Sequence, residues 1–317
     1  MNTQNNPEQN GLNRRGFLGT DSALAAGLGA VGLAGAEAKR PPVVMFTKHL
    51  QHLNYEEMAA ALARMGYDGA DIPVRKGGHV LPEQVEIDLP KAVRAVRVVG
   101  LDVPMITTDI EDPADPKTEP ILRMMAELQI PYYRIGTWHY NPQQDVIAQL
   151  HAWGEKMKRL AEWNQKYGVR AGYHNHSGLN YIGGPVFDVY EMLRGVDPEW
   201  VGCNFDTGHA VVEGGGGAWR TNFRLLASRI KMSAVKDFIW TKSEKGWRHQ
   251  FCPMGEGAVD WVEALKLFKA IGFTGPFSIH MEYPTAGQTK EEREANQIKD
   301  MERDMRVLRD RMAQAGF

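Results

Sequence analysis

Short apolar runs alternate with longer amphipathic stretches along most of the chain, and this alternation restricts the fold more than any other feature. Continuous apolar runs are typical of strands buried on both faces of a parallel sheet, and helical spacing marks the stretches between them. The predicted strands are residues 43–46, 69–72, 103–107, 132–135, 169–173, 201–205, 230–235 and 277–281. The predicted helices are residues 55–65, 89–99, 120–128, 143–167, 186–193, 219–227, 259–270 and 291–312. Strict alternation of this kind predicts a (β/α)8 barrel, with a doubly wound open sheet as the alternative, because one sequence does not give the strand order.

The N-terminal segment has the layout of an export signal. A polar run is followed by Arg14 and Arg15 and then by an Ala- and Gly-rich apolar segment at 22–36. The paired arginines resemble the twin-arginine type of signal, which exports folded proteins. We therefore expect a signal peptide at 1–38, one catalytic barrel domain at 39–317 and a periplasmic location. A membrane anchor is the alternative, but the segment is shorter than the ~20 residues that a spanning helix needs, so we expect no stable membrane insertion after cleavage.

Composition excludes several classes of protein. The formal net charge of -2 provides no positive excess for a nucleic-acid backbone, so nucleic acid is not an expected partner. Cys203 and Cys252 lack the spacing of a zinc knuckle or a redox dithiol, which leaves one disulfide or two inert thiols.

Histidines gather where the predicted strands end. Seven of the ten lie in or just after a predicted strand: His49, His79, His139, His174, His176, His209 and His280. The carboxyl ends of the strands carry the active site in a (β/α)8 barrel, so we expect these side chains to meet at one rim.

The later strands predict a metal site. His174 and His176 close the fifth strand on one face, Asp206 closes the sixth, and Glu282 closes the eighth. Mixed imidazole and carboxylate ligands suit Mn, Zn, Co or Fe(II), so we expect a divalent ion bound by His174, His176, Asp206 and Glu282. In the alternative interpretation, these groups only hydrogen-bond to one another.

A second polar set predicts a pocket for a small carbohydrate. Cationic and aromatic side chains suit a polyhydroxylated or anionic molecule. The candidate substrate-binding residues are Lys48, Arg75, His79, Arg134, Trp138 and His209. For Lys236 and Asp237, which end the seventh strand, contact with substrate is the preferred prediction and a structural ion pair is the alternative.

Two further features are weaker. Residues 214–217 are four consecutive glycines, which we expect to form a flexible loop that could act as a lid. On the last helix an apolar stripe packs against the barrel or, alternatively, contacts a second subunit of a homo-oligomer. The stripe consists of Ile298, Met301, Met305, Leu308 and Met312.

Together these motifs resemble the sugar phosphate isomerase/epimerase family, the xylose isomerase-like TIM barrels, and within it an exported branch with twin-arginine signals. The resemblance is carried by residues 173–176, 206–209, 236–237 and 255–257 and by Glu282. It implies one divalent ion held by a Glu, an Asp, a His and a Glu from strands five to eight. Asp206 and Glu282 match this pattern, and His209 matches a substrate contact. His174 replaces the first Glu and Ala234 replaces the His, and His176 or His209 could fill the vacant ligand position.

The resemblance further implies an isomerase or epimerase that abstracts a proton next to a sugar carbonyl and forms an enediolate. Glu282, His174 and Lys236 are the candidate catalytic residues. One alternative is a metal-dependent lyase or hydratase acting on 3-keto sugars or glycosides. Another is a non-catalytic sugar-binding barrel, because two family positions have changed.

Overall fold

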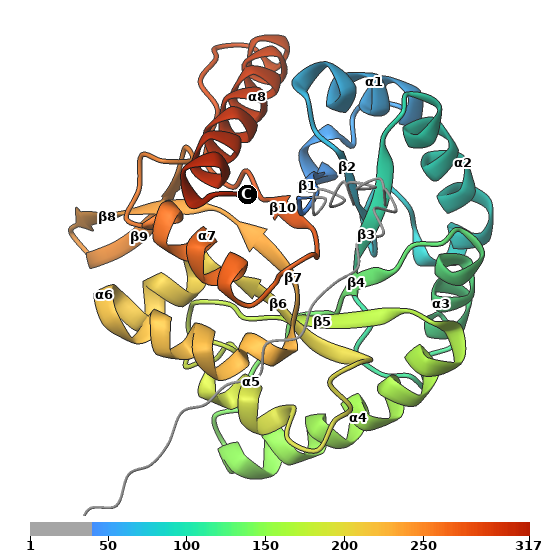
Figure 1. The fold of residues 1–317 in the computed structure, drawn as a ribbon, viewed down its shortest axis with the longest axis vertical. Coiled ribbons are helices and arrows are strands. Elements are labelled where there is room, and N and C mark those ends of the chain that lie inside the picture. Colours follow the sequence, from blue (N-terminus) through green and yellow to red (C-terminus); the bar gives the residue numbers. More distant parts are fainter. Residues whose placement is uncertain (1–39) are drawn as a thin grey trace, which may run out of the picture. The chain divides into compact units, whose positions relative to one another are not determined.

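The structure, a computed structural model, describes residues 40–317, and these form a closed barrel of eight parallel strands (Figure 1). The signal-peptide prediction lies outside the described residues. Around the barrel the strands follow the chain from β1 to β7, and β10 closes the ring between β7 and β1. This order confirms the (β/α)8 barrel and rules out the open sheet.

Each barrel strand begins and ends within two residues of the positions predicted from the sequence. The strands are β1 (Val43–Phe46), β2 (Gly69–Val74), β3 (Asp102–Thr108), β4 (Tyr132–Arg134), β5 (Arg170–His174), β6 (Val201–Asp206), β7 (Ile230–Val235) and β10 (Phe277–Ile279). The register places Ala234 of β7 beside Asp206 of β6 and beside Ser278 of β10. The ends of these three strands therefore lie together on one side of the barrel.

Helices follow the strands and cover the outside of the barrel. They are α1 (Tyr55–Met65), α2 (Val85–Val98), α3 (Thr118–Glu127), α4 (Val146–Tyr167), α5 (Phe187–Met192), α6 (Thr207–Leu226), α7 (Trp261–Ala270) and α8 (Lys290–Ala315), with short 3-10 turns η1 (Thr47–Leu50), η2 (Pro82–Gln84) and η3 (Ala227–Arg229). Capping boxes start α1 at Asn54 and α8 at Thr289. The predicted stripe on α8 packs inward, since Met301, Met305 and Leu308 are buried.

The glycine run 214–217 is not the loop that we predicted. It lies inside α6, where only Gly215 departs from helical angles, with φ 54° and ψ -156°. Glycine lowers helix stability by about 1 kcal/mol per residue, but Val211 and Trp219 on either side of the run are buried and hold the helix against the barrel. The result is a kinked helix, which overturns the predicted loop and leaves no lid there.

A two-stranded hairpin, which was not predicted from the sequence, lies between β7 and α7. Strands β8 (Asp237–Ser243) and β9 (Gly246–Cys252) pair antiparallel outside the barrel. Trp240 and Trp247 are exposed on it. Phe251, by contrast, turns toward the barrel, where its ring lies 5.7 Å from that of His209.

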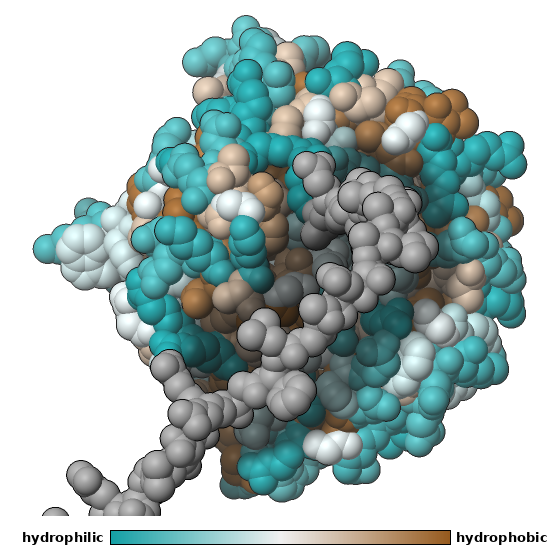
Figure 2. Space-filling model, in the orientation of Figure 1, coloured by the Kyte–Doolittle hydropathy of each residue, from teal (hydrophilic) through white to brown (hydrophobic). Residues whose placement is uncertain are grey.

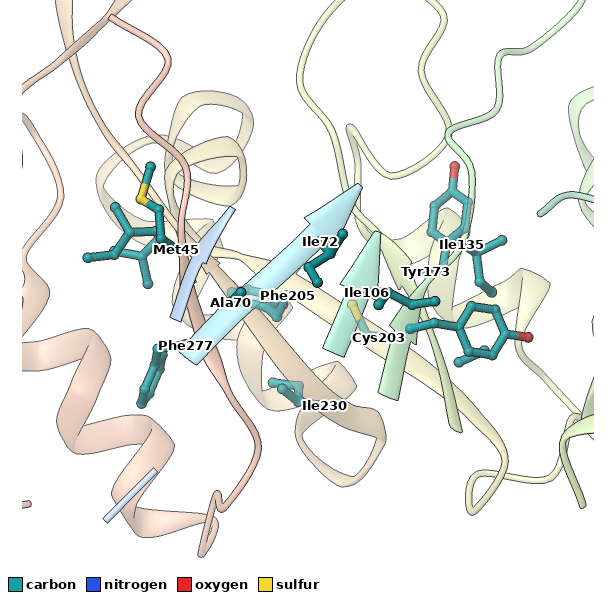
Figure 3. Packing of buried hydrophobic residues seen from close by; sticks show 14 of the residues in the cluster. Met45, Ala70, Ile72, Ile106, Ile135, Tyr173, Cys203, Phe205, Ile230 and Phe277 are labelled. Carbon is teal, nitrogen blue, oxygen red and sulfur yellow. The ribbon is translucent and has the colours of Figure 1, made fainter. Parts of the chain in front are cut away.

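Side chains along each barrel strand alternate between the outside of the barrel, which faces the helices, and its interior. Each side contains a cluster of apolar residues. Those facing the helices join the main core, and Figure 3 shows members of it such as Ile72, Ile106 and Phe205. Inside the barrel, Val44, Met105 and Met232 form a small separate cluster, called the basal layer here. The carboxyl ends of the strands lie beyond this layer, so it forms the floor beneath the site.

The outer surface is largely hydrophilic in the view of Figure 2, with separate apolar patches. Among residues 40–317, no helix combines the length and apolar character needed to cross a membrane. Cys203 and Cys252 are both free buried thiols, which settles the open question of a disulfide.

Candidate active site

Beyond the basal layer, the inward positions of the strands and of the residues directly after them are mostly polar. We call this set the polar mouth: Asp71, Thr107, Arg134, His174, Asn204, Asp206, Lys236, Ser278, His280 and Glu282. All are buried except Glu282, whose side chain is 23% exposed. Successive side chains on a strand point to opposite faces, so alternate residues point outward into the apolar core and inward into the barrel. The inward side chains near the carboxyl ends of the strands therefore lie together at that end of the barrel.

Lys236, directly after β7, lies at the centre of the polar mouth. Its Nζ is 2.9 Å from Glu282 Oε2, 3.0 Å from His209 Nε2 and 3.2 Å from Asp206 Oδ2. Burial alone would lower the pKa of Lys236, but the carboxylates of Asp206 and Glu282 raise it above its ordinary value. The side chain is therefore a buried ammonium ion.

Asp206 is held firmly at the end of β6. The side-chain amide of Asn175 donates to its carbonyl oxygen and accepts from its N–H, and Oδ1 accepts from the backbone N–H of His209. Oδ2 makes no hydrogen bond, although Lys236 lies nearby. Burial raises the pKa of this carboxyl to about 6, against the lowering effect of Lys236.

Three imidazoles pack beside Asp206. Nε2 of His174 lies 3.5 Å from Asp206 Oδ2, and the rings of His176 and His209 are 4.0 Å apart. His209 also hydrogen-bonds to Ser177 Oγ through Nδ1 at 2.7 Å. Burial lowers the pKa of His176 to about 4 and those of His174 and His209 well below the ordinary value, so all three are neutral at pH 7.

Glu282 is the accessible carboxylate of the polar mouth. Burial alone would raise its pKa, but the ammonium of Lys236 and the neighbouring His280 hold the pKa well below its usual range. The residue is therefore ionised at pH 7. His280, two positions earlier, stacks on His174 and has no hydrogen-bond partner at either ring nitrogen.

Three predicted substrate residues lie near these groups. The guanidinium of Arg134 is buried, donates to Thr137 Oγ1 at 2.9 Å and feels the charges of Asp71, Glu282 and Asp206. That of Arg75 lies 5.3 Å from the centre of the Phe46 ring. Lys48 follows β1 in η1, is exposed, and is close enough to lower the pKa of Glu282.

Two others are placed in packing roles. His79 donates from Nε2 to the carbonyl oxygen of Leu53 at 3.1 Å, and its ring lies against Tyr55. Trp138 is 2% exposed and stacks on Trp153 with ring centres 3.9 Å apart. The contacts of both side chains are therefore with loop and core residues.

Asp237 does not face the site, contrary to the preferred prediction. Its carboxylate accepts hydrogen bonds from the backbone N–H groups of Phe238, Gly255, Gly257 and Val259. A Cβ at Gly257 would meet Asp237 Oδ1 at 2.0 Å, so only glycine permits this approach. The side chains of Lys236 and Asp237 thus turn to opposite sides and do not pair with each other. Lys236 contacts the polar mouth, and Asp237 accepts backbone N–H groups of the following loop.

The predicted divalent ion can be tested against these donors. His174, Asp206 and His209 each offer a ligand atom within 4.8 Å of the others, which makes them a possible metal site. Lys236, however, already contacts Asp206 and His209, and the Nε2 lone pair of His209 accepts its N–H. Glu282 is also paired with Lys236, and His176 donates to the Ser177 carbonyl oxygen. With the ammonium in place, this donor set does not fit a divalent ion.

Several members of the site were not predicted from the sequence. Asn204, Thr107 and Ser278 occupy inward positions that strand alternation alone would have identified. Asn175 and Ser177, which hold Asp206 and His209, lie after β5 and carry no comparable signal. Phe251, from the hairpin, lies with its ring centre 5.0 Å from Lys236 Nζ.

Comparison with known proteins agrees with this architecture. An uncharacterised protein of Methanocaldococcus jannaschii is 23% identical over 124 residues, a match that spans 39% of this chain and 40% of that protein. The solved structure of a D-psicose 3-epimerase in the presence of D-fructose has a TM-score of 0.65 at 12% identity, covering 87% of this chain and 100% of the other. A 3-keto-D-glucoside 4-epimerase from E. coli has a TM-score of 0.63 at 12% identity, covering 86% and 100%.

At these identities the solved structures show a shared fold. The sequence itself matches the family described as xylose isomerase-like TIM barrel over residues 59–311, which is most of the chain. The protein therefore belongs to the xylose isomerase-like TIM barrel family.

Proposed function

We propose that this protein is a carbohydrate isomerase or epimerase that abstracts a proton from the carbon next to a sugar carbonyl. Family membership supports this assignment, and the structural neighbours named above act, by their names, on D-psicose and on a 3-keto-D-glucoside. The substrate would be a small carbohydrate bound at the carboxyl ends of the strands.

The observation that carries the proposal is the pairing of Glu282 with Lys236 at 2.9 Å. An ionised, partly exposed carboxylate can take a proton from carbon, and an adjacent ammonium can stabilise the negative charge that then develops on oxygen. Enolisation of a keto sugar needs both groups side by side. Of the carboxylates in the polar mouth, Glu282 is the accessible one.

Unpartnered polar atoms support a polyhydroxylated ligand. Asp206 Oδ2, Arg134 Nε and both ring nitrogens of His280 are buried without a hydrogen bond. Buried polar atoms are nearly always paired, so a set of this kind at one cavity end points to a ligand with many hydroxyl groups.

The chemical roles follow from accessibility. Glu282 acts as the base. His176, neutral and only partly buried, is better placed than the deeply buried His174 to exchange a proton with the substrate. His174 then acts through Asp206, 3.5 Å away. The predicted divalent ion would compete with Lys236 for Asp206 and His209, so no step is assigned to it.

A lyase or hydratase acting on a 3-keto glycoside is the second candidate. Its first step is the same proton abstraction, and the likeness to a 3-keto-D-glucoside 4-epimerase favours such a substrate. The two reactions differ in their product, because elimination releases the aglycone and epimerisation does not. Mass spectrometry of the products separates them.

Solvent exchange tests the proposal. The full chain is incubated in D2O with D-psicose, D-fructose or a 3-keto-glucoside, and loss of the carbon-bound proton is followed by NMR. We expect exchange with at least one of them and a fall of roughly 100- to 10,000-fold in Glu282→Gln. Glu162→Gln, on an exposed position of α4, is the matched control and should exchange normally. Saturable binding without exchange would instead favour the non-catalytic barrel.

A further inference from the structure

The polar mouth contains a positive charge of its own, supplied by the chain. The ammonium of Lys236 lies within 3.2 Å of two carboxylates and one imidazole: Glu282, Asp206 and His209. An ammonium has three N–H donors. The contacts with Glu282 and His209 are hydrogen bonds, and the third N–H is the one available to Oδ2 of Asp206, which lies 3.2 Å from Nζ as an ion pair.

The surrounding residues hold this ammonium in place. The side chain of Lys236 is 2% exposed, and Phe251 of the hairpin packs near its end. On the other side lies Gly208, where a Cβ would meet Lys236 Cγ at 2.9 Å and the Lys236 carbonyl oxygen at 2.7 Å. Glycine at this position therefore makes room for the lysine stem.

The carboxylates of the polar mouth already have at least as many cations around them without a metal. Asp206, Glu282 and Asp71 are these carboxylates, and the cations that act on them are Lys236, Arg134, Arg75 and Lys48. A divalent ion added to this set would place a double positive charge next to a buried ammonium. Uncompensated buried charge is strongly unfavourable, so the ion and the ammonium exclude each other.

We propose that the Lys236 ammonium performs the task of a divalent metal ion in this barrel: the N–H next to Asp206 binds the substrate carbonyl oxygen, and catalysis is independent of metal. The inference rests on the proposed function, whose reaction it specifies. Asp206 Oδ2 would accept a hydrogen bond from the neighbouring substrate hydroxyl. Two adjacent substrate oxygens are thereby fixed by one donor and one acceptor.

The proton transfer balances without any co-reactant. Glu282 takes the proton from the carbon next to the carbonyl, and the C–H electron pair forms the carbon–carbon double bond of the enediol. The carbonyl π electrons move to oxygen, where the Lys236 N–H stabilises the charge. Return of a proton from water to the same carbon on the opposite face gives an epimer. Its return to the former carbonyl carbon, with transfer of the neighbouring hydroxyl proton to the former carbonyl oxygen, gives an isomer.

Metal uptake tests the inference without a substrate. The full chain is dialysed against EDTA and titrated with Mn2+ by calorimetry, with Asp206→Ala alongside. We expect no stoichiometric uptake by the wild type. One equivalent bound by the wild type and lost in Asp206→Ala would overturn the inference. Because this arm uses the wild-type chain, it holds even if a Lys236 variant fails to fold.

Lys236→Met supplies the second arm, with Lys231→Met at the start of the same strand as the matched control. Removing the ammonium should allow Asp206 and His209 to bind Mn2+. It should also slow solvent exchange by roughly 100- to 1000-fold, which is the effect of deleting one hydrogen-bond donor to a developing oxyanion. Lys231→Met should do neither, and EDTA should leave wild-type exchange unchanged. A folded Lys236→Met that exchanges as fast as wild type contradicts the inference. Absence of exchange with every sugar, together with absence of metal uptake by the wild type, contradicts only the proposed function.

Discussion

The two ends of the barrel interior use the same strands for different purposes. At the basal layer, Met105 of β3 and Met232 of β7 pack against Val44. Two residues further along β3, and four further along β7, the inward positions carry Thr107 and Lys236, which are polar and buried. The height of a position along its strand, rather than the strand to which it belongs, decides whether an inward side chain contributes packing or chemistry.

The largest effect is expected from removing one charge at the polar mouth. Asp206→Asn keeps an oxygen that can accept the N–H of His209 but removes the anionic partner of Lys236. We expect solvent exchange to fall roughly 1000-fold, as for loss of a preorganised electrostatic partner, with little change in the free energy of unfolding. Exchange by NMR and urea unfolding measure the two quantities. If the folded variant exchanges at the normal rate and is only less stable, Asp206 contributes to stability and not to chemistry. That result would contradict the difference between the polar mouth and the basal layer.

The opposite pattern is expected at the basal layer. Met232→Ala removes a buried side chain that packs over Gly172, where a Cβ would lie 2.3 Å from Met232 Cε. The cavity should lower the free energy of unfolding by roughly 2–5 kcal/mol. Exchange per folded molecule should stay within about threefold of wild type, since the residue is remote from Lys236 Nζ. Urea unfolding checks this, and a large loss of activity in the folded variant would contradict it.

Asp71 lies between the two levels and predicts a pH effect on stability. Its hydroxyl partners are Thr107 and Ser278, and burial raises its pKa from 3.8 to about 6. The folded protein therefore binds more protons than the unfolded chain between these values, so stability falls as the pH rises through that window. Ionisation of Asp71 should lower the free energy of unfolding by roughly 3 kcal/mol across this window. In Asp71→Asn, the decline in the free energy of unfolding from pH 4 to 7 should be smaller by that amount. Parallel pH–stability curves for the two proteins would rule this out.

The smallest effect is expected from crowding the lysine stem. Gly208→Ala places a methyl group 2.9 Å from Lys236 Cγ, whereas a Cβ at Gly216 of the same helix meets nothing within 4 Å. We expect a 10- to 100-fold loss of exchange in Gly208→Ala, because a displaced ammonium no longer meets its acceptors. Gly216→Ala should leave exchange unchanged. Equal exchange rates in the two variants would show that the lysine position does not depend on Gly208.

The fold was predictable because its signal is local and repeated. Each apolar run of four to six residues identifies a strand by itself, and Asp206, Lys236 and Glu282 could be assigned to strand ends from position alone. The kink in α6 was not predictable in this way, because its glycines favour a loop and only tertiary packing of Val211 and Trp219 keeps the helix together. The hairpin was missed although Lys245 and Gly246 mark its turn between two alternating runs.

The site was only partly predictable, for a different reason. Sequence order indicates that Asp206, His209 and Lys236 reach the same rim, but it does not say which of them touch. The contacts of Lys236 join three segments far apart in the chain and depend on the length of the lysine side chain. Likewise, the preferred role of Asp237 was wrong because two successive residues face opposite sides, and only the loop at 255–257 shows which partner each one meets.

The opposite directions of Lys236 and Asp237 have a mechanical consequence. One planar peptide unit joins the Cα of Lys236 to the Cα of Asp237, whose carboxylate accepts the N–H groups of Gly255, Gly257 and Val259. A substitution in that loop that displaces Asp237 is therefore expected to displace the backbone of Lys236 as well. The loop outside the barrel thus helps to set the backbone position from which the lysine side chain enters the site.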